Sequence, residues 1–227
     1  IKDRRFCGIG FSMPGQVDPK RNTAVHNTRI DKWDNVDFNR FRRFSDTIVT
    51  ENVANAAAIG EHLRGAATDV DDFVLLRVGN GAGMGIMING KLHRGHNFAA
   101  GEAGHVIIDE GSQTTCACGN RGCLESFVSR RAVMRELTRL RESEVPSGIL
   151  SDLESHRGDG IFKTLGTYYE SGDKVAYLVM QELAHKLGLA AANFVQILAP
   201  ARIVISGPIS NLGDPFLNLV EQNLRRY

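Results

Sequence analysis

One histidine upstream of three closely spaced cysteines constrains this chain more than any other feature. His105 precedes Cys116, Cys118 and Cys123, and these are three of the four cysteines in the chain. Zn²⁺ is held in proteins by four such ligands, and three cysteines with one histidine form a standard closed set for a structural site. The spacing therefore predicts one structural Zn²⁺ bound by these four residues.

A disulfide and a cluster of buried thiols are the two alternatives for these cysteines. Cys116 and Cys118 are too close in sequence to pair comfortably. Gly119 and Gly122 lie between the second and third cysteine, where they let the backbone turn sharply enough for the sulfurs to converge. A cluster of buried thiols would not need these glycines, so zinc remains the favoured interpretation.

Length and charge narrow the class of protein. A chain of 227 residues can bury one large core or two small ones. Its net charge of +1 gives no electrostatic reason for this part of the protein to bind nucleic acid or an anionic membrane. No apolar run reaches a membrane-spanning length, no signal-peptide pattern opens the sequence, and thiols gathered around a metal fit a reducing compartment. We therefore expect a cytoplasmic protein.

Hydrophobic patterning predicts an α/β fold without internal repeats. Residues 22–38 read as polar and irregular, and 152–160 read as a loop. Glycine-containing turns are expected at 79–83 and at Asn89-Gly90, the latter a hairpin signal. The expected strands are 6–11, 47–50, 73–78, 86–88 and 202–207, and the expected helices are 56–63, 124–141 and 175–198.

Several segments together resemble the ROK family of sugar kinases and sugar-responsive transcriptional repressors, most like the repressor branch. The Gly101-Glu102-Ala103-Gly104-His105 string and the zinc loop from Cys116 to Glu125 are each specific, and they occur in family order with segments 8–18, 52–61, 79–85, 89–92 and 191–207. The resemblance implies a two-domain, actin-like (ribonuclease H-like) α/β fold. We expect residues 1–68 to be the remainder of a small N-terminal domain and 69–227 a large domain carrying the zinc loop.

The resemblance also implies that the chain is truncated at both ends. Family kinases open with an Asp-x-Gly-x-Thr strand and turn that grips nucleotide phosphates, and nothing upstream of Phe6 can play that part. The family's closing glycine-alanine helix is missing before Tyr227. Since the chain also starts at Ile1 rather than at a methionine, we expect it to be a fragment of a longer protein.

The resemblance implies a sugar site made of Asn52, Glu102, His105 and Glu125. Sugar hydroxyls both donate and accept, so carboxylates, an amide and an imidazole can each contact neighbouring hydroxyls. Glu102 and His105 would share a face if their segment is helical. The imidazole of His105 can serve both sites, with one nitrogen on zinc and the other donating to a hydroxyl.

Each of the three remaining residues has a simpler alternative. Glu125 could be a solvated carboxylate at a helix start, where a negative charge is favourable. Asn52 could be only a helix cap, a role compatible with a ligand contact. For Glu102 the alternative of an ordinary surface residue is weaker, because flanking glycines allow close backbone approach.

Several positions depart from the pattern of the family kinases. Val53 stands where those enzymes carry the aspartate that takes the proton from the attacking sugar hydroxyl, and valine cannot accept a proton. Glu51 is the one neighbouring carboxylate that could substitute as base. In the nucleotide loops, Asn80 replaces a threonine, Met84 replaces a glycine, and Pro208 removes a backbone N–H.

We therefore expect a sugar-sensing effector domain of a transcriptional regulator that has no kinase activity, and two rival hypotheses stay open. Its DNA-binding helix-turn-helix would lie upstream of the present chain. The first rival is an ATP-dependent sugar kinase of the same family, and the second is a scaffold that senses nothing. Family members imply a homodimer or homotetramer, a sugar ligand and structural Zn²⁺.

Overall fold

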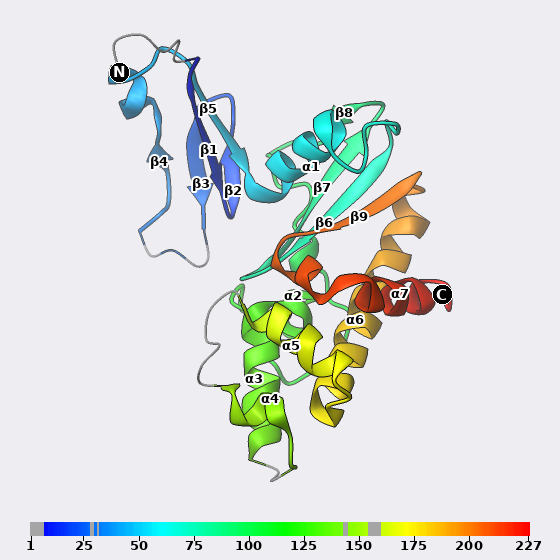
Figure 1. Cartoon of the computed structure of the whole chain (residues 1–227). Helices are drawn as coiled ribbons and strands as arrows, with labels where there is room; N and C mark the ends of the chain where they lie inside the picture. The colour runs from blue at the N-terminus through cyan, green and yellow to red at the C-terminus, as the bar shows by residue number, and fades with distance from the viewer. Residues whose placement is uncertain (1–6, 28–29, 31, 143–144, 154–159) are drawn as a thin grey trace.

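The first part of the chain forms two small sheets. The structure, a computed structural model, describes residues 7–27, 30, 32–142, 145–153 and 160–227 (Figure 1). Strand β1 (Ile9–Met13) pairs in parallel with β5 (Ile48–Asn52). An antiparallel sheet is formed by β2 (Gln16–Asp18), β3 (Thr23–His26) and β4 (Val36–Asp37), and the short helix η1 (Asn39–Arg43) follows. We call residues 7–52 the N-terminal unit.

The N-terminal unit has a small core of its own. Its buried members are Met13, Val17, Ala24, Phe38 and Ile48. The prediction that 22–38 is irregular is wrong, because β3 and β4 both lie in that segment. These strands are only four and two residues long, too short for alternating hydrophobicity to stand out. The predicted strand start at Phe6 lies outside the described residues.

A four-stranded sheet forms the centre of the rest of the molecule. Its order is β8 (Lys91–Leu92), β7 (Ala82–Ile88), β6 (Phe73–Val78) and β9 (Arg202–Ser206), with β9 parallel to β6 and the other pairs antiparallel. The predicted strands at 73–78 and 202–207 are thus confirmed. Asn89 and Gly90 both adopt positive φ, as the predicted tight hairpin turn requires.

Both faces of this central sheet are covered by helices (Figure 1). Phe73 and Leu75 of β6 pack with Ala58 of helix α1 (Val53–Arg64). Val74 and Leu76 point to the other face, into the larger core that includes helix α6. A central strand covered on both faces explains why β6 is an almost continuous apolar run.

Of the further helices in the described part of the chain, the longest is α6 (Lys174–Leu198), which confirms the predicted helix at 175–198. The predicted helix at 124–141 is divided at Ser129, whose Oγ accepts a hydrogen bond from the N–H of Ala132 and so starts a second helix. None of the helices in the described ranges is both long and apolar enough to cross a membrane. The others are α2 (Glu125–Val128), α3 (Arg130–Arg141), α4 (Gly148–Ser151), α5 (Ile161–Glu170) and α7 (Gly213–Leu224), with the short helices η2 (Ala103–His105) and η4 (Pro208–Leu212).

The predicted loop at 152–160 lies mostly outside the described residues, since residues 154–159 are not among them. The domain boundary between residues 68 and 69 stays a prediction. The chain itself passes from the N-terminal unit to the central sheet through β5, which leads directly into α1.

Candidate functional site

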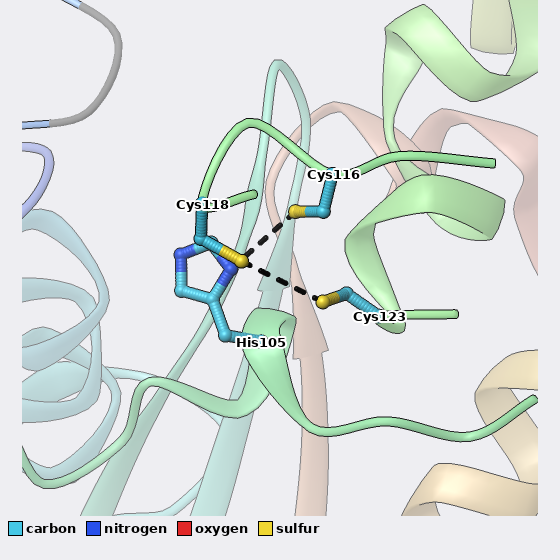
Figure 2. Close-up of side chains that lie close together, drawn as sticks. All are labelled: His105, Cys116, Cys118 and Cys123. Carbon is cyan, nitrogen blue, oxygen red and sulfur yellow. Dashed lines mark hydrogen bonds between the residues drawn. The ribbon is translucent and has the colours of Figure 1, made fainter. Parts of the chain in front are cut away.

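The four predicted metal ligands converge on one point. Figure 2 shows the three sulfurs and the imidazole of His105 facing a common centre. Their ligand atoms all lie within 4.8 Å of one another, with 3.6 Å between Cys116 Sγ and His105 Nδ1 and 3.7 Å between Cys118 Sγ and Cys123 Sγ. A tetrahedron with metal–sulfur bonds of about 2.3 Å has edges of about 3.8 Å. The cluster therefore has the size and the donor set that fit Zn²⁺.

The electrostatics of the cluster favour a bound cation. Burial, together with the neighbouring Cys118 and Cys116 thiols, raises the pKa of the Cys123 thiol to about 12. Three thiolates side by side in a largely buried place are therefore unfavourable on their own. A divalent cation bound by these residues would supply the compensating charge, since metal ligation requires the cysteines in their thiolate form.

The backbone of the loop shows why two glycines are needed there. Gly119 and Gly122 both have positive φ, at 90° and 71°. A Cβ on Gly122 would lie 1.9 Å from the carbonyl oxygen of Asp109, so no side chain fits. The N–H of Cys116 donates to the carbonyl of Asn120 at 2.7 Å and closes the turn. The prediction that both glycines shape this loop is confirmed.

One lysine braces the metal loop against helix α6. Lys186 Nζ donates to Asp109 Oδ2 at 3.0 Å and lies 4.6 Å from the centroid of the Phe127 ring. Its side chain is only 12% exposed. The hydrogen bond from Lys186 holds the pKa of the Asp109 carboxyl below its usual range. This contact, in which the lysine is largely buried and the aspartate is partly exposed, fixes the start of the loop relative to the helical core.

Glu102 and His105 lie side by side at η2. The Nε2 atom of His105 is 3.9 Å from Glu102 Oε2, while its Nδ1 faces Cys116. The side chains of Glu102 and His105 are 42% and 26% exposed, so both can reach solvent. The His105 ring thus faces the cysteines with Nδ1 and Glu102 with Nε2.

Glu125 is buried at the start of α2. Only 7% of it is exposed, and its Oε2 accepts a hydrogen bond of 3.0 Å from the N–H of Ala82, the first residue of β7. The alternative of a solvated carboxylate is therefore wrong. Gly104 of η2 also approaches Ala82, since an added Cβ would lie 2.2 Å from the Ala82 carbonyl oxygen. Glu125 and the segment carrying Glu102 and His105 thus meet at the beginning of β7.

Asn52 lies at the junction of β5 and α1. Its Oδ1 accepts from the N–H groups of Ala54 at 2.7 Å and Asn55 at 3.3 Å, so it caps α1. Its Nδ2 donates to the carbonyl of Gly15 at 2.8 Å. An amide nitrogen carries two hydrogens, so the second can still be donated to a ligand. The sugar-binding role of this residue and of the other three stays a prediction.

Sequence reasoning missed the environment of Glu51. Its Oε2 accepts from Arg94 Nε at 2.9 Å and Nη2 at 2.6 Å, and its Oε1 accepts from Asn52 N–H at 3.0 Å and Asn55 Nδ2 at 3.1 Å. Arg94 belongs to a polar loop 43 residues further along the chain. No local spacing could have indicated this pair.

The positions that resemble nucleotide loops make contacts within the protein. Asn80 Oδ1 accepts a hydrogen bond of 2.6 Å from Arg130 Nε. Pro208 packs against Gly79, where an added Cβ would lie 2.8 Å from Pro208 Cδ. Met84 does not add bulk to a loop, as the sequence had suggested, because it lies in β7 with its side chain in the core.

Comparison with known proteins finds one family that matches almost the whole chain. The model of the ROK family matches residues 2–227. A xylose repressor of Caldicellulosiruptor bescii is 32% identical over 221 residues, which are 96% of this chain and 54% of the repressor. A glucokinase of Halalkalibacterium halodurans is 31% identical over 226 residues, which are 98% of this chain and 67% of the enzyme. The relatives thus include both regulators and enzymes.

A solved structure agrees with the sequence comparison. The ROK family glucokinase of Streptomyces griseus, in complex with glucose and AMPPNP, has a TM-score of 0.87 and 31% sequence identity. The match covers 99% of this chain and 73% of the glucokinase chain. The chain spans about half the length of the curated xylose repressor that it matches.

Proposed function

The chain belongs to the ROK family, and we propose that it is the sugar-sensing effector part of a ROK transcriptional regulator. In this proposal it binds a monosaccharide or a close derivative and does not phosphorylate it. The observation that carries the proposal is Val53, the first residue of α1, at the position of the catalytic aspartate in family kinases. General-base assistance contributes about 10²- to 10⁴-fold to such reactions, so its loss leaves at most a residual rate.

The surroundings of Glu51 support the absence of a replacement base. Its two oxygens together accept four hydrogen bonds, two of them from the Arg94 guanidinium. The side chain is 9% exposed. An ionised carboxylate has about four acceptor positions, and the contacts of Glu51 occupy four. Glu51 is therefore poorly placed to take a proton from a sugar hydroxyl.

Contacts in the former nucleotide loops support the same proposal. The side chain of Asn80 is engaged with Arg130, and Pro208 covers Gly79. Proline has no N–H to donate and fixes its own φ. A nucleotide would have to compete with these contacts for the space and the donors that the family kinases use.

The polar groups expected at a sugar site remain, which favours a sensor over a mere scaffold. Glu102 and His105 both reach solvent and lie together at η2. We assign the cluster of His105, Cys116, Cys118 and Cys123 to structural Zn²⁺. With the metal on Nδ1, the imidazole carries its proton on Nε2 and donates it toward a sugar oxygen.

The remaining parts of the proposal concern the whole protein. DNA binding is assigned to a helix-turn-helix domain upstream of this chain, in keeping with the names of the repressor relatives. We propose a homodimer or homotetramer in the cytoplasm. Sugar binding changes operator affinity only if it favours one domain arrangement over another, and a coupling of about 1 to 3 kcal/mol corresponds to about 5- to 150-fold.

The test measures catalysis and binding on the same full-length preparation. A coupled assay with ATP and a panel of D-xylose, D-glucose and N-acetylglucosamine should stay at background. Calorimetry with the same panel should detect binding of at least one sugar. Turnover on the order of 1 per second, ordinary for an enzyme, would establish the kinase alternative. Absence of both turnover and binding would favour the scaffold.

A further inference from the structure

One loop of the central sheet reaches the N-terminal unit. It runs from residue 93 to 101, between β8 and η2, and both ends are fixed to β7. The N–H of His93 donates to the Ile86 carbonyl at 2.8 Å, and the Gly101 carbonyl accepts from the N–H of Met84 at 2.8 Å. A Cβ on Gly101 would lie 2.0 Å from the Met84 carbonyl oxygen, so the end of this loop is held close to the sheet.

Three contacts connect the middle of this loop to the N-terminal unit. Arg94 binds Glu51 of β5 through two nitrogens. The carbonyl of Asn97 accepts a hydrogen bond from the side-chain amide of Gln16 in β2. Lys20 Nζ lies 5.9 Å from the centroid of the Phe98 ring. The loop therefore contacts three residues of the unit, and the ion pair is the strongest of these contacts.

The ion pair is half-buried and its acidic member is fully engaged. The Glu51 side chain is 9% exposed and that of Arg94 is 34% exposed. The second carboxylate oxygen of Glu51 accepts from Asn52 N–H and Asn55 Nδ2. Burying such a pair contributes little net stability, because desolvation opposes the attraction. The ion pair instead favours one arrangement of the N-terminal unit relative to the central sheet. Moving them apart would leave the largely buried Glu51 carboxylate without its cation.

The pair lies between the two halves of the proposed sugar site. Glu51 immediately precedes Asn52, and the loop that carries Arg94 ends immediately before Glu102. Forming the pair therefore sets the distance between the strand that carries Asn52 and the segment that carries Glu102 and His105. A sugar that contacts both sides must favour the arrangement in which they are close.

We propose that Arg94 and Glu51 form a clasp that holds the N-terminal unit against the central sheet in the sugar-binding arrangement. Arg94 is then a positioning residue that acts without touching the sugar. The inference rests on the proposed sugar-binding function. If breaking the clasp lowers the fraction of molecules in the competent arrangement, the apparent dissociation constant rises by the inverse of that fraction.

The test uses five full-length variants beside the parent, of which one is a control. Arg94→Gln and Glu51→Gln each remove one charge, and the double variant removes both. Arg94→Lys keeps the charge without the two-nitrogen contact. Arg64→Gln is the matched control, because Arg64 is an exposed arginine at the end of α1. Thermal melting and zinc content confirm that each variant is folded.

Calorimetry with D-xylose, D-glucose and N-acetylglucosamine gives the first readout. We expect Arg94→Gln to weaken binding by about 10- to 100-fold, which corresponds to a competent fraction of about a tenth to a hundredth. Arg94→Lys should lie between it and the parent, and Arg64→Gln should equal the parent. The double variant should lose no more than either single variant, because the two residues act through each other. Binding by Arg94→Gln equal to the parent would overturn the clasp.

Small-angle X-ray scattering gives a second readout that does not require sugar binding. The sugar-free Arg94→Gln variant should have a larger radius of gyration than the sugar-free parent, and saturating sugar should reverse the increase. An unchanged radius in this variant would overturn the clasp even if no sugar in the panel binds. Absence of sugar binding by the parent counts against the proposed function alone, so the two failures can be told apart.

Discussion

The Nε2 atom of His105 lies 3.9 Å from Oε2 of Glu102, while Nδ1 of the same ring faces Cys116 Sγ at 3.6 Å. The imidazole therefore faces the predicted metal cluster with one nitrogen and Glu102 with the other. If a metal is bound at Nδ1 as proposed, Nε2 is the nitrogen that remains for a ligand. Changes to the metal cluster should consequently be felt in ligand binding.

The first prediction concerns the metal cluster. Protein purified without added zinc should contain close to one Zn²⁺ per chain by elemental analysis. The Cys118→Ser variant should lose zinc, melt at a lower temperature and bind sugar about tenfold to hundredfold more weakly, because the metal also positions His105. Cys7→Ser, a change outside the cluster, is the control. A folded, metal-free parent protein would contradict the assignment.

The second prediction concerns Glu102. Its replacement by alanine should weaken sugar binding by about 10- to 150-fold, the range expected when a charged hydrogen-bond partner worth about 1.5 to 3 kcal/mol is removed. The exposed neighbour Glu110 provides the control variant Glu110→Ala, which should bind like the parent. Calorimetry on both variants decides the matter. Equal affinity in Glu102→Ala and the parent would remove Glu102 from the sugar site.

The third prediction concerns Val53, which stands at the position proposed for the catalytic aspartate of the family kinases. Val53→Asp alone should not produce a useful kinase, because Asn80 and Pro208 still occupy the nucleotide loops. The coupled ATP assay should remain at background for this variant with every sugar that the parent binds. Efficient phosphorylation by Val53→Asp would show that the nucleotide loops still bind nucleotide. It would contradict the argument that the contacts of Asn80 and Pro208 prevent catalysis.

The fourth prediction concerns Asp173, which caps two helices. Its carboxylate accepts from the N–H groups of Val175 and Ala176 in α6, from Gly148 in α4, and from Ser147 Oγ. Burial alone would raise the pKa of this carboxyl, but the hydrogen bonds lower it below its ordinary value. Asp173→Ala should therefore reduce the free energy of unfolding by about 1 to 3 kcal/mol, since each lost cap costs about 0.5 to 2 kcal/mol.

The pH dependence of this effect has a definite sign. Because the pKa of Asp173 is lower in the folded state, its contribution is fully present above the unfolded pKa near 4 and is lost as pH falls through the folded pKa. The stability difference between the parent and Asp173→Ala should accordingly shrink in acid. Urea unfolding at pH 7 and pH 3 measures it, with the exposed Asp46→Asn as control. A difference that grows in acid would contradict the hydrogen-bonded carboxylate.

Features with local signals could be predicted from the sequence. The residues of the His105, Cys116, Cys118 and Cys123 cluster are chemically distinctive and close along the chain, so their spacing was sufficient to predict that they converge. The central strands were equally clear, because burial on both faces gives β6 a continuous apolar run. The short strands β3 and β4 gave no periodic signal, and the division at Ser129 depends on a cap that also fits within a longer helix.

Features that depend on distant contacts could not be predicted. The burial of Glu125 results from its contact with Ala82, 43 residues earlier in the chain. The partnership of Glu51 and Arg94 spans the same separation, and Arg94 lies in a polar segment that looks like any surface loop. Charged residues are usually exposed, so their burial is visible only once the fold brings their partners together.

The contact between Pro208 and Gly79 also bears on how this lineage can change. If the chain is a sensor as proposed, a return to phosphoryl transfer would need an aspartate at position 53, a different residue at 208 and the release of Asn80 from Arg130. The last two changes would each disturb an existing contact. No single substitution would then restore catalysis, so selection acting one mutation at a time would have no uphill route back.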